Sequence, residues 1–262
     1  MKIIKEKSDH GVLRLIMNNL DQGNALSEGM MSILMDEIKG ASSDQSIKVI
    51  VLAANGNVFC SGHDLKEITA ARENEDSGEI YFKNLFDSCS SLMQLIVNTP
   101  QPVIAEVDGV ATAAGCQLVA SCDLAIASHE SKFATPGVNI GLFCSTPMVA
   151  LSRNVNKKNA MEMLLTGDFI NAEKAKEIGL INNMVQKEEL TFEVSKLAEK
   201  IASKSSMTVS IGKKAFYAQA EMDLSKAYKY TSKTMKDNVL KYDAKEGINA
   251  FIEKRSPHWK DE

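Results

Sequence analysis

The sequence predicts an α/β protein whose body alternates strands with helices and whose C-terminal part is almost wholly helical. Short β-branched or aliphatic runs recur up to Val185, with amphipathic helical patterns between them, and strand signals stop after Glu188. The chain has 262 residues, of which 44% are hydrophobic and 24% charged, so it is long enough to bury a large core in one domain.

Six stretches have the composition of strands. Each is short, apolar and bounded by turn residues, as expected for strands that are at least half buried. They are residues 1–5, 11–17, 48–53, 103–107, 123–127 and 181–185.

The helical patterns have recognisable starts and ends. Ser27 is the predicted N-cap of a helix that runs to about Ile38. Apolar residues then recur at helical spacing from Phe82 to Ile96, and Pro100 ends the run. Strands and helices therefore alternate through this part of the chain.

The C-terminal part is predicted to contain helices at residues 192–203, 210–220 and 224–239. We assign residues 1–190 to the core and residues 191–262 to a helical region of the same structural unit. The polar stretch 72–78 has the composition of a mobile loop.

Composition excludes several classes of function. The net charge of −4 comes from 30 basic and 34 acidic residues that are interspersed, without a basic block that could follow a phosphate backbone, so nucleic acid is not an expected partner. The five cysteines show no zinc-binding spacing, which predicts no metal site and a reducing compartment. The sequence also lacks the motifs GxSxG, GxGxxG, HExxH and Walker A.

The expected cellular location follows from the absence of targeting and membrane-spanning patterns in the sequence. It opens directly into a strand-like stretch, and it has no signal-peptide pattern and no apolar run long enough to span a membrane. We expect a cytoplasmic protein without membrane contact, while a removed organellar presequence would leave the same sequence.

Two strand-to-helix turns are the candidate sites of chemistry. In the first, residues 56–63 join a strand to an expected helix that begins at Asp64, where Glu67 three residues later predicts a capping box. In the second, residues 108–110 lead to the small-residue helix start 113–117. Free N–H groups at two helix N-termini suit a developing oxyanion, although small residues at such turns also serve close packing alone.

The residues around these turns resemble the enoyl-CoA hydratase/isomerase (crotonase) superfamily. The segments that carry the resemblance, in matching order and spacing, are residues 59–67, 102–109 and 114–123, with further pieces at 24–26, 165–168, 172–180 and 251–255. The resemblance therefore covers nearly the whole chain.

This resemblance implies a fold and an assembly. The family fold is a spiral of ββα units with a helical C-terminal trimerisation region, and its members form homotrimers or dimers of trimers. It also implies an acyl-CoA thioester as the partner, within the lyase and isomerase reactions of fatty acid metabolism. Coenzyme A is then part of the substrate, and no cofactor is bound permanently.

The matching motifs also imply site residues. The backbone N–H groups of His63 and Ala114 would form the oxyanion hole, and Ala114 keeps this donor although many relatives have glycine there. The imidazole of His63 is expected either to be packed or solvated, or to contribute beside the thioester. Coenzyme A would run beside the residues of the first turn, namely Cys60, Ser61, Gly62, Asp64 and Leu65.

Lys254 and Cys144 each have two possible roles. Lys254 would reach a phosphate of coenzyme A, in its own or a neighbouring subunit, or remain a solvated surface lysine. Cys144 lies in a segment that lines the acyl pocket in relatives, and it is either an ordinary small buried residue or a proton-exchanging thiol.

Two departures from the family pattern limit the reaction. A standard hydratase has a glutamate at each of the positions held here by Gln117 and Gly137. Neither residue can usefully exchange a proton near neutral pH, so efficient hydration is not expected. The sequence leaves open another hydratase/isomerase-type reaction, decarboxylation or hydrolysis of an acyl-CoA, and acyl-CoA binding without catalysis.

Overall fold

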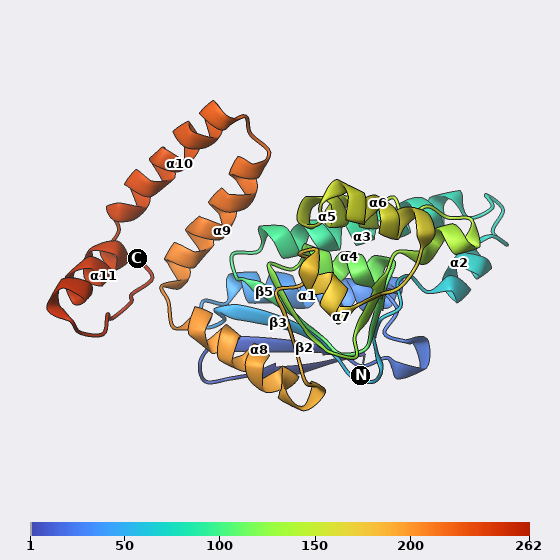
Figure 1. Ribbon diagram of the computed structural model, residues 1–262, viewed down its shortest axis with the longest axis horizontal. Coiled ribbons are helices and arrows are strands. Elements are labelled where there is room, and N and C mark those ends of the chain that lie inside the picture. Colours follow the sequence, from blue (N-terminus) through green and yellow to red (C-terminus); the bar gives the residue numbers. More distant parts are fainter. Residues whose placement is uncertain (1) are drawn as a thin grey trace.

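The strands form two sheets (Figure 1). The structure, a computed structural model, describes residues 2–262, so Met1 of the first predicted strand lies outside it. The larger sheet has the strand order β1-β2-β3-β5-β7-β10, in which β1 is antiparallel to β2 and the other pairs are parallel. Its strands are β1 (Ile3–Lys7), β2 (Val12–Met17), β3 (Val49–Ala54), β5 (Val103–Val107), β7 (Leu124–Ser128) and β10 (Asn183–Val185).

The smaller sheet has the order β4-β6-β8-β9 and was not foreseen from the sequence. The strands β4, β6 and β8 run parallel, and β9 is antiparallel to β8. None is longer than three residues, which is too short for a periodic pattern to be recognised. They are β4 (Val58–Cys60), β6 (Val110–Thr112), β8 (Lys132–Ala134) and β9 (Ile170–Asn171).

The chain repeats one path through the two sheets. A strand of the larger sheet is followed by a strand of the smaller sheet and then by helices, first as β3-β4, then as β5-β6 and finally as β7-β8. This is the predicted spiral of ββα units. The helices that follow each pair are α2 (Leu65–Ala71) with α3 (Glu79–Asn98), α4 (Ala114–Ser121), and η2 (Pro136–Ile140) with α5 (Pro147–Asn154) and α6 (Lys157–Thr166).

Helices cover both faces of the larger sheet. Alternate residues of β3 divide between two cores: Leu52 packs with α1 (Glu28–Ser43) and α3, whereas Val51 packs with α8 (Lys187–Ala202). Burial on both faces explains why the central strands are continuously apolar instead of alternating. The predicted N-cap is confirmed, since Ser27 accepts a hydrogen bond from the N–H of Met30.

The remaining helices extend away from the body. After α7 (Ala172–Glu177), β10 and α8, the helices α9 (Ser206–Ala220), α10 (Leu224–Val239) and α11 (Tyr242–Glu253) form a separate group at one end of the molecule (Figure 1). The expected division at residue 190 falls within α8, which lies against the sheet.

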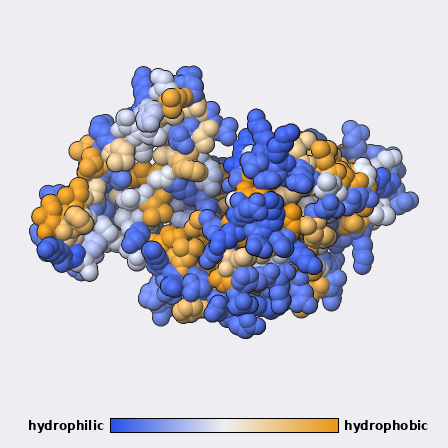
Figure 2. All heavy atoms as spheres, viewed as in Figure 1, coloured by the Kyte–Doolittle hydropathy of each residue, from blue (hydrophilic) through white to orange (hydrophobic). Residues whose placement is uncertain are grey.

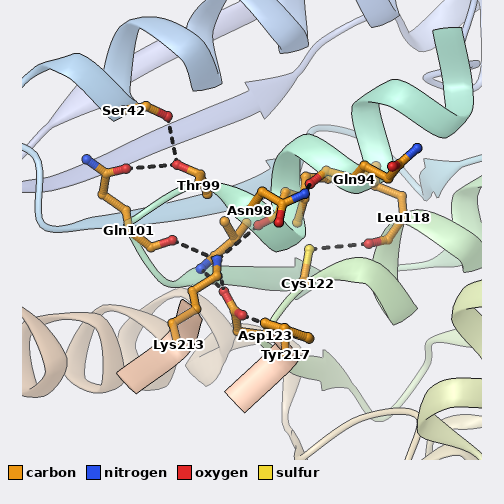
Figure 3. Close-up of polar contacts among 12 residues, drawn as sticks. Ser42, Gln94, Asn98, Thr99, Gln101, Leu118, Cys122, Asp123, Lys213 and Tyr217 are labelled. Carbon is orange, nitrogen blue, oxygen red and sulfur yellow. Dashed lines mark hydrogen bonds and ion pairs between the residues drawn. The ribbon is translucent and has the colours of Figure 1, made fainter. Parts of the chain in front are cut away.

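A partly buried ion pair joins α9 to the body (Figure 3). The ammonium group of Lys213 donates to Asp123 Oδ2 at 2.6 Å and to the carbonyl oxygens of Ile96 and Gln101, both at 2.9 Å. Tyr217 donates to the other oxygen of Asp123 at 2.9 Å. Burial lowers the pKa of Lys213, and the carboxylate opposes this shift. All three donors of the ammonium group are therefore used at the junction between helix and core.

Replacing Lys213 should loosen this junction. Lys213→Met would leave the largely shielded charge of Asp123 without its cation, and we expect the free energy of unfolding to fall by about 3–5 kcal/mol. Urea denaturation followed by circular dichroism measures this change.

The neighbouring exposed lysine provides the matched control. Lys214→Met should change the free energy of unfolding by less than about 0.5 kcal/mol. Equal effects of the two variants would contradict the role given to the ion pair.

Candidate active site

Three turns meet at the carboxyl ends of the parallel strands β4, β6 and β8. The register pairs Cys60 with Ala111 and Thr112 with Ala134. Beyond the strands, the hydroxyl of Thr112 donates to the carbonyl of Ser61 at 3.0 Å, and the N–H of Ala113 donates to the carbonyl of Ala134 at 2.9 Å. The turns 61–64, 113–114 and 135–137 therefore lie side by side, at the edge where parallel sheets commonly hold ligands.

The first two turns each present a free backbone donor. Within residues 2–262, the N–H groups of His63 and Ala114 have no hydrogen-bond acceptor. A Cβ atom placed on Gly62, which has φ +95°, would lie only 3.5 Å from the nitrogen of Ala114. The structure thus brings the two sequence-predicted oxyanion turns into contact, and their free donors suit a developing negative charge.

The start of α4 depends on close backbone contact. A Cβ on Gly115 would lie 2.1 Å from the carbonyl oxygen of Cys60, so only glycine fits there. Ala113 has φ +50° and ψ −117°, a conformation that alanine rarely adopts and that stores strain. Hydrogen bonds from the N–H of Ala113 to Ala134 and from the N–H of Gln117 to the carbonyl of Ala113 keep this strained residue in place before Ala114.

Gln117 lies one turn into α4 and is buried. Its side-chain oxygen accepts a hydrogen bond from the thiol of Cys89 on α3 at 3.7 Å. Burial raises the pKa of that thiol to about 12. An amide beside a neutral thiol has no group that exchanges protons readily near pH 7.

Gly137 lies in the third turn, and the space for a side chain there is filled. A Cβ would come 2.3 Å from the carbonyl oxygen of Leu142 and 2.9 Å from the sulfur of Cys144. The N–H of Leu142 donates to the carbonyl of Gly137 at 2.9 Å, which folds the following loop back over the turn. The chain therefore lacks a carboxylate here and also lacks room for one.

Cys144 is buried beside this turn. Burial raises the pKa of its thiol, and a hydrogen bond from the N–H of Gly137 counteracts the shift in part. A raised pKa keeps the group as a thiol at neutral pH, which does not favour a nucleophilic role.

The residues expected to line the coenzyme A path lie in the first turn or directly beside it in the sequence. Cys60 is buried, and burial raises its pKa to about 12, whereas Ser61 and Leu65 are exposed. Asp64 is the N-cap of α2 and accepts from the N–H of Lys66 at 2.8 Å, as predicted.

The predicted capping box is wrong. The carboxylate of Glu67 accepts from the hydroxyl of Tyr81 at 3.2 Å and from the N–H of Glu28 at 3.3 Å, instead of returning to the N-cap. These partners come from α3 and from the start of α1, which no local pattern could indicate.

Lys254 is not brought to the site. It is the C-cap of α11, in a left-handed conformation with φ +56°, and it is exposed. Figure 1 places α11 in the outlying helical group, away from α2 and α4. A contact with coenzyme A in a neighbouring subunit stays a prediction.

Asn24 supports the first turn in a way that the sequence did not reveal. Its side-chain amide donates to the carbonyls of Asn55 at 3.0 Å and Val58 at 2.7 Å, which fixes the connection from β3 to β4. It has φ +51°, a conformation for which asparagine is suited. The family resemblance included residues 24–26, but only the structure shows this contact.

Residues 7–262 match the family described as enoyl-CoA hydratase/isomerase. The chain belongs to this family.

Relatives within the enoyl-CoA hydratase/isomerase family agree in sequence and fold. The human protein named enoyl-CoA hydratase domain-containing protein 3, mitochondrial, is 49% identical over 252 residues, which cover 96% of this chain and 82% of the relative. The crystal structure of the human domain-containing protein 3 has a TM-score of 0.94 at 47% identity, over 99% of this chain and 100% of that one. An enoyl-CoA hydratase structure from Mycobacterium smegmatis has a TM-score of 0.94 at 44% identity, over 99% of both chains.

The sequence also predicts a likeness to one group within the family. The run 133–147, which contains Gly137 and Cys144, most resembles enoyl-CoA hydratase domain-containing protein 3 and its bacterial relatives. This prediction and the crotonase-type fold are confirmed. In residues 2–262, no helix is long and apolar enough to cross a membrane.

Introducing a carboxylate at residue 137 should destabilise the protein. Gly137→Glu forces a side chain against the backbone oxygen of Leu142, and we expect a loss of about 1–3 kcal/mol in the free energy of unfolding. We also expect no gain in hydration of crotonyl-CoA. Urea denaturation and absorbance of the enoyl thioester measure the two effects.

Gly40 gives the matched control, since nothing lies within 4 Å of a Cβ placed there. Gly40→Glu should leave stability nearly unchanged. A stable Gly137→Glu variant that hydrates crotonyl-CoA efficiently would show that the third turn is open.

Proposed function

We propose that the protein binds an acyl-CoA thioester with its carbonyl oxygen between the N–H groups of His63 and Ala114, and that it acts on the thioester through an enolate or oxyanion. The observation that carries this proposal is the contact between two turns that each present a free backbone donor. Each such donor is worth about 2.7–4 kcal/mol to a transition state with a negative oxygen.

Coenzyme A would enter as part of the substrate, and the proposed chemistry needs no permanently bound cofactor. Cys60, Ser61, Gly62, Asp64 and Leu65 would accompany it along the first turn. Backbone donors at helix starts supply the polarising charge in place of a metal ion.

Hydration of an enoyl-CoA is not the proposed reaction. A positioned acid or base contributes roughly 10²–10⁴-fold each, and the chain has Gln117 and Gly137 where a hydratase has two glutamates. Isomerase-type chemistry, decarboxylation and hydrolysis each form a negatively charged oxygen that the two donors can hold. Decarboxylation of a malonyl-type thioester produces its enolate without a base.

A second candidate is binding of acyl-CoA without turnover. The filled volume beside Gly137 favours binding without turnover, because it leaves no room for an acidic or basic side chain at residue 137. Both candidates need the same oxyanion contacts, and turnover separates them.

Ala114→Pro tests the proposed contact by removing one N–H donor. Proline is accepted at the first position of a helix, so α4 can still form. We expect turnover of the best substrate among enoyl-CoA and malonyl-type thioesters to fall by about 10²–10³-fold. If the protein only binds, the affinity for acyl-CoA should fall instead.

Ala114→Gly retains the N–H and is the matched control for this test. It should keep turnover and affinity close to those of the original chain. Equal behaviour of the proline and glycine variants in both assays would exclude Ala114 as an oxyanion donor.

We also propose that the chain assembles into a trimer, alone or paired into a hexamer. Two separate apolar surfaces support this (Figure 2). The first surface lies over η2, α5 and α6 and exposes Phe143, Val149 and Leu165. The second surface lies over α9–α11, around a groove of about 600 Å³ that is lined by Phe251 and Trp259. Two different surfaces on one chain suit head-to-tail contacts, which close into a ring.

Sedimentation velocity tests the assembly. The original chain should sediment as a trimer or hexamer, and Phe251→Asp should shift it to smaller species because a charge enters the apolar surface. Leu20→Asp changes an exposed leucine on another part of the chain and should leave the assembly intact. A monomeric original chain would refute the proposal.

The relatives carry mitochondrial names, and those names describe the relatives. The cytoplasmic location expected from the sequence stays a prediction for this chain.

A further inference from the structure

The imidazole of His63 has one nitrogen engaged and one free. Nδ1 lies 3.1 Å from the carbonyl oxygen of Leu26. A carbonyl only accepts hydrogen bonds, so in the neutral ring the proton resides on Nδ1 and the lone pair on Nε2. Nε2 is buried and has no hydrogen-bond partner in residues 2–262. A buried acceptor without a partner is uncommon in proteins and needs an explanation.

This free nitrogen belongs to a residue of the proposed site. The main-chain N–H of the same residue is one of the two oxyanion donors. The ring packs edge-on against Phe86 of α3, with centroids 5.7 Å apart. Three residues later on α3, Cys89 contacts the amide of Gln117. The imidazole and Gln117 therefore lie against neighbouring positions on one helix.

The surroundings keep the imidazole neutral. Burial lowers the pKa of His63, while the Leu26 carbonyl and the charge of Glu67 act in the opposite direction. Glu67, on α2, is the charged group that acts on the ring, and α3 contributes Phe86. A pKa below the usual 6.5 leaves the ring unprotonated at pH 7, which is the state that a base requires.

We propose that Nε2 of His63 removes and returns the α-proton of an acyl-CoA thioester bound in the oxyanion hole. This inference rests on the proposed function. The C–H bond at the α-carbon breaks, and its electron pair forms an enolate whose oxygen is held by the N–H groups of His63 and Ala114. The proton moves to Nε2, while the proton on Nδ1 stays hydrogen-bonded to Leu26. The reverse transfer restores the thioester, and no other reactant is consumed.

Hydrogen–deuterium exchange tests this single step. The full-length protein is incubated with butyryl-CoA in D₂O, and NMR follows the loss of the α-proton signal. His63→Gln and His63→Leu keep the main-chain N–H but lack the basic nitrogen. Calorimetric titration with butyryl-CoA measures binding to each protein, and circular dichroism identifies any variant that does not fold.

We expect the original chain to exchange the α-protons and both variants to lose about 10²–10⁴-fold in rate at an unchanged dissociation constant. The wild-type rate should fall as the pH is lowered through the pKa of His63, which burial places below the usual 6.5, because imidazolium has no lone pair to accept the proton. A purely structural histidine would give neither result. Even if both variants misfold, a pH profile without an acidic decrease would exclude His63 as the base.

Other outcomes overturn the inference in distinguishable ways. Three outcomes would exclude His63 as the base and leave the binding proposal intact. They are binding without exchange by the original chain, exchange by the variants at the wild-type rate, and a rate that does not fall on acidification anywhere in the pH range in which the protein stays folded. Absence of butyryl-CoA binding by the original chain would refute the proposed function, and this inference would fall with it.

Discussion

The candidate site depends on the close parallel alignment of three very short strands. The strands β4, β6 and β8 place their carboxyl ends at one edge, and side-chain and main-chain hydrogen bonds continue the alignment beyond the last paired residues. Gly115 lets the start of α4 approach the carbonyl of Cys60. Without that approach the two free donors would belong to separate turns, and neither helix start alone would form an oxyanion hole.

Much of this arrangement could be read from the sequence. The longer strands, the N-cap at Ser27 and the extent of α10 follow from local patterns. The family resemblance supplied the pairing of His63 with Ala114, which hydrophobic periodicity cannot provide because it carries no information on contacts between distant turns. The smaller sheet was not predicted, because strands of two or three residues are too short to show the alternation of apolar and polar residues that marks a strand.

Other features depend on tertiary contacts. Glu67 has the sequence position of a capping-box residue, but hydrogen bonds from Tyr81 and Glu28 draw its carboxylate elsewhere. The free nitrogen of His63 becomes visible only when Leu26 is known to occupy the other one. Local propensity describes a residue's neighbours along the chain, whereas these contacts cross between elements far apart in the sequence.

The filled space beside Gly137 also bears on how this chain could change over time. The backbone at Leu142 occupies the volume that a glutamate side chain at residue 137 would need. Substitutions at contacting positions are not independent, so the effect of one depends on whether the other is present. A change in the path of residues 142–144 would make room for a glutamate at residue 137. The path of a neighbouring segment therefore constrains residue 137, and a glutamate there costs stability as long as that path is unchanged.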